Sequence, residues 1–140
     1  MNPLTSRRQA VDLLLLVPAL YLAGLVLYAM AGRWDHPFDL EWMEGGMLAH
    51  AWRIQEWLPV YTEPDADWIP YIYPPGYAAV VAALGSVFGL SMGLGRLVSI
   101  AGTLAAAGAL VASGVRLKNP VAGGLGACLY LICFPCSGAF

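Results

Sequence analysis

Charge is distributed very unevenly along this chain, and this limits what the chain can fold into. Four stretches carry no charged residue: 13–32, 68–95, 97–115 and 119–140. The hydrophobic fraction is 59% and the charged fraction only 11%, whereas roughly a quarter of a soluble domain is charged. This composition excludes a soluble enzyme and a disordered tail, and the scattered Lys and Arg residues exclude a nucleic-acid binder. We therefore expect an all-α membrane protein with about four apolar helical segments.

The first uncharged stretch predicts a transmembrane helix over 11–32, after a cytoplasmic N-terminus of residues 1–10. It is long enough to cross a bilayer, which takes about 20 apolar residues. Arg7 and Arg8 are expected to keep the N-terminus inside. A cleaved signal peptide is the alternative, because Ala-Met-Ala at 29–31 resembles a cleavage site. The apolar run is longer than a usual signal core and more apolar segments follow, so we favour an uncleaved anchor.

Three further membrane helices are expected, at about 74–90, 95–116 and 120–137. The first of them is near the lower length limit for a span. Simple alternation across the membrane then places Arg116 and Lys118 outside, against the tendency of basic residues to stay inside. One of the three segments is therefore expected to tilt, re-enter or stop short. Frequent small residues in the last two predict close helix packing in a bundle.

The acidic loop, residues 33–73, is expected on the extracytoplasmic side and to carry an amphipathic juxtamembrane helix over about 40–58. Eight of the nine acidic residues of the chain lie in this loop. Apolar residues recur in it at helical spacing: Met43, Met47, Ala51, Ile54 and Leu58. Such a stripe is typical of a helix that lies on a membrane surface.

Three carboxylates stand at the start of that predicted helix. Asp39 is the expected N-cap, and Glu41 and Glu44 are expected in the first turn, where the helix dipole favours negative charge. Together they can act as a general base or bind a divalent cation. The residues alone favour the alternative, a solvated and capped helix start. Gly45 and Gly46 weaken the helix, which indicates close approach of backbone or ligand there.

The next stretch is rich in proline and aromatic residues. Its prolines make it extended and stiff, and Pro74 and Pro75 are suited to open the following helix. Tyrosine and tryptophan side chains indicate a membrane interface. Asp65 and Asp67 form a D-x-D pattern, which is known from metal sites of nucleotide-sugar enzymes. No strand precedes the pattern, so we interpret it as a solvated turn.

Five short motifs follow one another in this region. They are D-L-E-W-M-E-G-G, A-W-R-I, L-P-V-Y, P-Y-I-Y-P-P-G-Y and G-x-G-R-L-x-S. In this order and spacing they resemble the start of the GT-C membrane glycosyltransferases. The bacterial group similar to protein O-mannosyltransferases and lipid A aminoarabinose transferase is the best fit. The resemblance covers most of the chain, from about Asp35 to Phe140.

The resemblance implies an enzyme of the bacterial inner (cytoplasmic) membrane. It would transfer a sugar from a polyprenyl-phosphate donor to an acceptor hydroxyl at the outer face, with inversion. An acid of the first outer loop would act as base or help to bind a divalent cation, and the matching positions are Glu44, Asp39 and Glu41. Glu44 is preferred for its Glu-Gly context. The candidate substrate-binding residues are Arg53, Tyr61 and Tyr73, with Arg53 either at the donor phosphate or at the membrane interface.

Enzymes of this kind are usually much longer and carry a second acidic outer segment. We therefore expect the chain to be the N-terminal portion of a transferase and to be inactive alone. The alternative is a small non-enzymatic membrane protein that packs with a partner through its small-residue helices. Loss of sugar transfer on replacing the loop acids would distinguish the two.

Overall fold

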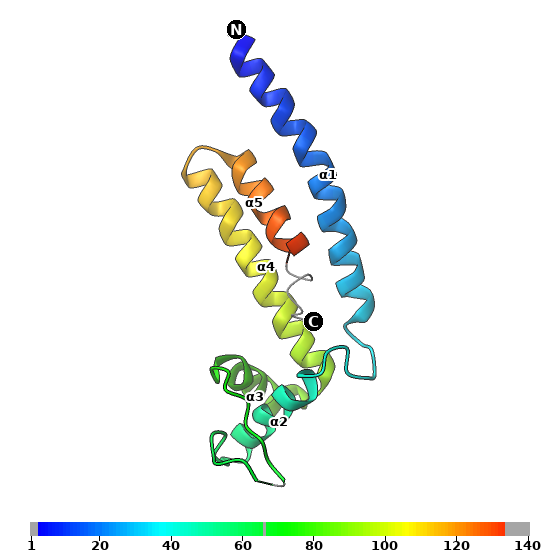
Figure 1. Cartoon of the computed structure of the whole chain (residues 1–140), viewed down its shortest axis with the longest axis vertical. Coiled ribbons are helices and arrows are strands. Elements are labelled where there is room, and N and C mark those ends of the chain that lie inside the picture. The colour runs from blue at the N-terminus through cyan, green and yellow to red at the C-terminus, as the bar shows by residue number, and fades with distance from the viewer. Residues whose placement is uncertain (1–2, 66, 134–140) are drawn as a thin grey trace. The chain divides into compact units, whose positions relative to one another are not determined.

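The computed structural model describes residues 3–65 and 67–133, and the regular elements in these ranges are all α-helices. They are α1 (Pro3–Arg33), α2 (Glu44–Gln55), α3 (Gly76–Phe88), α4 (Met92–Arg116) and α5 (Pro120–Cys133), as labelled in Figure 1. The expected all-α class is confirmed for this part of the chain. The last residues of the segment predicted at 120–137 lie outside it.

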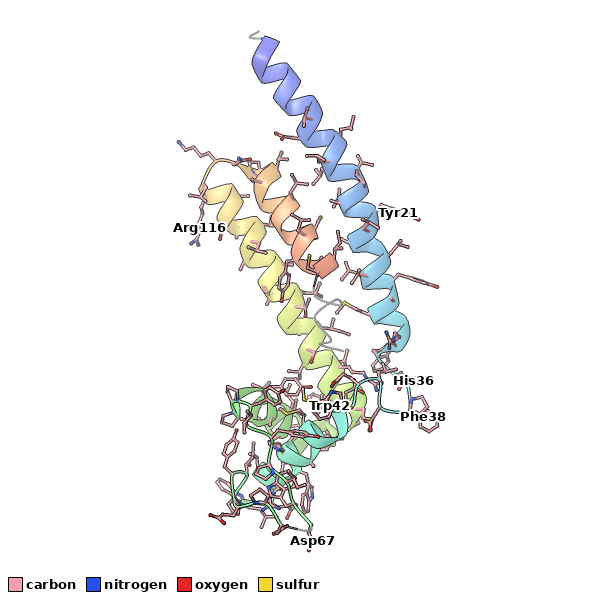
Figure 2. The ribbon with its side chains drawn as sticks, viewed as in Figure 1. Tyr21, His36, Phe38, Trp42, Asp67 and Arg116 are labelled. Atoms are coloured by element: carbon pink, nitrogen blue, oxygen red, sulfur yellow. The ribbon has the colours of Figure 1, made fainter. Side chains whose placement is uncertain are left out.

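Two of the helices are long and apolar enough to cross a membrane. These segments are Leu14–Arg33 in α1 and Met92–Arg116 in α4. Their side chains are largely uncovered, and Tyr21 on α1, labelled in Figure 2, is 67% exposed. By length and composition they suggest a membrane protein. The other two apolar helices, α3 and α5, have only 13 and 14 residues, so four membrane helices are not confirmed.

The chain divides into two compact units. Unit 1 contains α1, α5 and the part of α4 from Ile100 onward. Unit 2 is the continuous segment Trp34–Ser99, which contains α2, α3 and the first turns of α4. The predicted acidic loop therefore folds as one body with the apolar helix that follows it.

Small residues hold unit 1 together. Its core is made of Ala23, Ala107, Ala127, Cys128 and Leu131. A Cβ atom on Gly114 of α4 would lie 2.5 Å from the Cα of Gly123 in α5. Since real Cβ atoms do not approach so closely, the two helices can meet there only through glycine. The predicted close packing of the small-residue segments is present inside this unit.

In unit 2 the apolar stripe of α2 packs against α3. Ala51 of α2 and Ala78, Val81 and Ala82 of α3 are buried together, with Met47 and Ile54 beside them. The stripe was expected to lie on a membrane surface, but its middle part packs on α3, while Leu58 lies beyond the helix and is exposed. The prolines open α3 as expected, because Pro75 occupies the N-cap position.

Three expectations about α2 are wrong: its bounds, its N-cap and the place of Glu41. The helix covers Glu44–Gln55 rather than about 40–58, and its N-cap is Met43, not Asp39. The reason is a turn that precedes the helix. The amide of Glu44 donates to the Glu41 carbonyl at 3.1 Å, and the Glu44 carboxylate accepts the Leu40 amide at 2.8 Å. Glu41 consequently lies before the helix, and only Glu44 lies in its first turn.

Candidate functional site

The most strongly bonded feature of unit 2 is a salt bridge between the starts of two helices. Glu44 is the first residue of α2 and Arg96 lies one turn into α4. The Arg96 Nε atom donates to Glu44 Oε1 at 2.9 Å, and Nη2 donates to Oε2 at 2.7 Å. The two side chains are 9% and 19% exposed. This two-bond geometry is the strong form of an arginine–carboxylate pair.

The same guanidinium also binds the backbone of the loop between α1 and α2. Nη1 donates to the His36 carbonyl at 2.6 Å, and Nη2 donates to the Phe38 carbonyl at 2.7 Å. His36 and Phe38 are labelled on this loop in Figure 2. A guanidinium has five N–H donors in a fixed plane, so one side chain fixes both the loop and the start of α2. We call six residues the Arg96 cluster: His36, Phe38, Asp39, Leu40, Glu44 and Arg96.

The three predicted catalytic carboxylates have different environments. Glu44 accepts the two Arg96 bonds and the Leu40 amide. Glu41 Oε2 accepts the Met43 amide at 2.9 Å. Asp39 is exposed, lies near enough to Arg96 to interact with its charge, and makes no hydrogen bond to the described part of the chain.

Glycine allows Asp39 to lie against the first turn of α2. A Cβ atom on Gly45 would be 3.4 Å from Asp39 Oδ2. On Gly46 it would be 2.1 Å from the Tyr71 ring. The sequence predicted a close approach of backbone or ligand at these glycines; the structure places the Tyr71 side chain against Gly46 and the Asp39 carboxylate in van der Waals contact at Gly45.

The three carboxylates do not gather around one point. Within residues 3–65 and 67–133, no three His, Cys, Asp or Glu side chains form a group that could hold a metal ion. Glu44 is bonded to Arg96 and Glu41 to its own turn. These residues do not fit the divalent-cation site that the resemblance implies.

The candidate substrate-binding residues help to fold the extended segment after α2. Arg53 Nε donates to the Pro59 carbonyl at 2.9 Å, and the Arg53 guanidinium lies 4.4 Å above the Trp68 ring. The Tyr61 hydroxyl donates to the Tyr73 carbonyl. Each of these contacts joins two parts of the segment 53–73.

His50 of α2 is buried against this segment, a position that the sequence did not indicate. It is 1% exposed, and its Nε2 accepts the Tyr71 amide at 3.1 Å. Its ring lies 5.5 Å from Tyr71 and 5.0 Å from Trp68, measured between centroids. Burial, and secondly the charge of Arg53, lower the pKa of His50 below 6.5, which agrees with an imidazole that accepts at Nε2.

The D-x-D pattern is a turn, as expected. Asp65 Oδ1 accepts the amide of Asp67 at 2.9 Å and also that of Trp68. Asp67, labelled in Figure 2, is exposed. The carboxylate of Asp65 is therefore used to close the turn.

Comparison with protein-family models, curated proteins and solved structures finds no match for the chain. The Arg96 cluster therefore has to be interpreted from its own geometry.

Proposed function

We propose that unit 2 is the extracytoplasmic loop of a multi-pass membrane glycosyltransferase, and that Asp39 is its general base. The donor would be a polyprenyl-phosphate-linked sugar and the acceptor a hydroxyl group. The observation that carries this proposal is the exposed carboxylate of Asp39 on a loop whose backbone Arg96 holds by its carbonyls. A base must be both reachable and held in position, and fixed positioning contributes much of the rate in such reactions.

This proposal moves the base from Glu44, which the sequence favoured, to Asp39. The oxygens of Glu44 already accept two guanidinium N–H groups and one backbone amide. An acceptor hydroxyl would have to displace one of these donors. In the proposed role Glu44 instead positions Arg96, and Arg96 positions the loop that carries Asp39.

The proposed reaction is a single displacement. The acceptor oxygen attacks the anomeric carbon from the side opposite the phosphate, and its proton passes to a carboxylate oxygen of Asp39. The bond from the anomeric carbon to the phosphate oxygen breaks, and the polyprenyl phosphate leaves with the electron pair. The configuration of the sugar is inverted. In this proposal the terminal nitrogens of Arg53, whose Nε is bonded to Pro59, contact the donor phosphate.

The proposal is tested in membranes that contain the full-length gene product. Radiolabelled polyprenyl-phosphate glucose and polyprenyl-phosphate mannose are the probes, and loss of sugar from the lipid is measured. Asp39→Asn is expected to slow the transfer at least about 100-fold, the usual contribution of a general base. Glu63→Gln, which replaces another exposed acid of the loop, is the matched control and should leave the rate unchanged. A wild-type rate for Asp39→Asn, or no loss of either sugar above that in membranes lacking the protein, overturns the proposal.

A further inference from the structure

The helix α3 has two apolar faces, and only one of them is covered. Ala78, Val81, Ala82 and Gly85 form the buried face, which packs on α2. Val80, Leu84, Val87 and Phe88 lie at helical spacing on the other side and are 48%, 38%, 75% and 75% exposed. We call this second set the outer face of α3. An apolar face of this kind indicates an interaction surface.

The helix α3 is short for a bilayer crossing. Its 13 residues extend about 20 Å at 1.5 Å per residue, whereas the hydrocarbon core of a bilayer is about 30 Å thick. The helix predicted at about 74–90 covers Gly76–Phe88, and its C-cap is Gly89, where φ is +83°. This left-handed conformation favours glycine and stops the helix.

The neighbour of α3 is also unsuited to the hydrocarbon core. The partner helix α2 contains Glu44, Arg53 and Gln55. Gln55 Nε2 donates to the Ala82 carbonyl of α3 at 2.8 Å, so the contact between α2 and α3 includes a polar side chain. A pair with one polar helix belongs at the membrane surface, where the polar groups reach water.

Two further observations identify a lipid bilayer as the partner of the outer face. The helix α3 contains no charged residue, and its Ser86 hydroxyl donates to the Ala83 carbonyl of the same helix. Unit 2 is also joined directly to a membrane-length segment at each end. It begins one residue after Leu14–Arg33 and ends within Met92–Arg116. If these segments cross the bilayer, the outer face of α3 has a lipid surface within reach.

We propose that the outer face of α3 lies on the bilayer surface, and that between Pro3 and Lys118 the chain crosses the membrane only twice, through α1 and α4. Residues 34–91, between the two crossing segments, then stay on one side. Arg116 and Lys118 come to the same side as Arg7 and Arg8, which removes the conflict with the positive-inside tendency. This inference is independent of the proposed function, and its tests use no enzymatic activity.

The number of crossings is tested by labelling single cysteines in intact cells. The native cysteines are first replaced by alanine, and Glu63→Cys, Ser91→Cys and Lys118→Cys are then exposed to a membrane-impermeant maleimide. Two crossings predict that the variants at 63 and 91 are labelled and that the variant at 118 is labelled only after lysis. If α3 crosses the membrane, the results at 91 and 118 are reversed. That reversal overturns the proposal, and the position at 118 gives the answer independently should the variant at 91 not fold.

The lipid contact of the outer face is tested with a fluorescent label. Val87→Cys and the control Glu56→Cys are each labelled with nitrobenzoxadiazole in vesicles of anionic phospholipid. Nitroxide placed near the lipid headgroups is expected to quench the label at 87 at least about twofold more than the label at 56. Nitroxide at the bilayer centre is expected to quench the label at 87 less than headgroup nitroxide does. Equal quenching at 56 and 87, or strongest quenching from the bilayer centre, contradicts the proposal.

Discussion

In unit 1 the helices meet through small apolar residues, whereas unit 2 adds to its apolar α2–α3 contact a set of side chains that donate and accept hydrogen bonds. The close contact of unit 1 is Gly114 against Gly123. The corresponding feature of unit 2 is Arg96, which binds one carboxylate and several backbone carbonyls. The difference fits two surroundings. Small residues suffice where lipid covers the rest of a helix, while unit 2 has specific polar contacts beside its apolar core.

This difference can be measured because the tryptophans report on one unit alone. All five lie in unit 2, at Trp34, Trp42, Trp52, Trp57 and Trp68. Tryptophan fluorescence therefore follows the unfolding of unit 2 in detergent. Far-UV circular dichroism follows both units, and a transition seen by dichroism alone belongs to unit 1.

The largest effect is expected from removing the guanidinium of unit 2. Arg96→Met leaves the Glu44 carboxylate without its charged partner and releases the His36 and Phe38 carbonyls. Breaking one partner of a buried pair costs about 3–5 kcal/mol. The midpoint of the fluorescence transition should shift strongly to a lower denaturant concentration. Arg116→Met is the control, because Arg116 is exposed at the end of α4. Equal effects of the two substitutions would contradict the role given to Arg96.

The next effect is expected in unit 1. Gly114→Ala places a Cβ atom 2.5 Å from the backbone of Gly123, so α4 and α5 must separate, at a cost of about 1–3 kcal/mol. The matched control is Gly108→Ala, which meets no atom within 4 Å. The denaturant midpoint of the dichroism transition should decrease for Gly114→Ala and not for Gly108→Ala. The midpoint of the fluorescence transition should stay the same in both variants. A shift of the fluorescence transition by Gly114→Ala would show that the two units do not unfold separately.

A smaller effect of the same kind is expected in unit 2. Gly46→Ala brings a Cβ atom to 2.1 Å from the ring of Tyr71. The ring can move in part, so we expect about 1–2 kcal/mol of destabilisation, within the range for overpacked positions. Gly76→Ala is the control, because nothing lies within 4 Å of its added Cβ. The midpoint of the fluorescence transition should decrease for Gly46→Ala but not for Gly76→Ala. An unchanged midpoint for Gly46→Ala would argue against the contact between Gly46 and Tyr71.

The smallest effect is a dependence of unit 2 on pH. Burial lowers the pKa of His50 in the folded chain below its ordinary 6.5, so the unfolded chain binds the proton first. The stability that His50 contributes by staying neutral is fully present above pH 6.5. This contribution is lost as the pH falls from 6.5 through the lower pKa of the folded chain. The midpoint of the fluorescence transition should decrease between pH 7.5 and 5.5, and the slope should flatten in His50→Gln. An equal slope in the variant would assign the effect to other groups.

Local patterns in the sequence predicted the local structure well. The spacing of Met47, Ala51 and Ile54 indicated one apolar helix face, which α2 has, and Gly46 lies against the side chain of Tyr71. The partner of that face was predicted wrongly. A stripe identifies an apolar surface but not whether lipid or α3 covers it.

The Arg96 cluster could not be derived from spacing, because Glu44 and Arg96 are 52 residues apart. One signal was available: Arg96 is the only charge between Asp67 and Arg116. A charge within such an apolar region requires a partner, and the single acidic loop is where the partner lies. His50 gave no comparable signal, since its burial arises from Tyr71 and Trp68 of a later segment.

The claim that unit 2 is organised by the Arg96–Glu44 pair is tested most directly by a double-mutant cycle. Arg96→Met, Glu44→Leu and the double variant are compared with the wild type by tryptophan-monitored unfolding. The account predicts a coupling energy of at least about 2 kcal/mol, in the upper range for residues in one network, with the double variant more stable than Arg96→Met alone. Additive effects, with no coupling beyond about 0.5 kcal/mol, would contradict it.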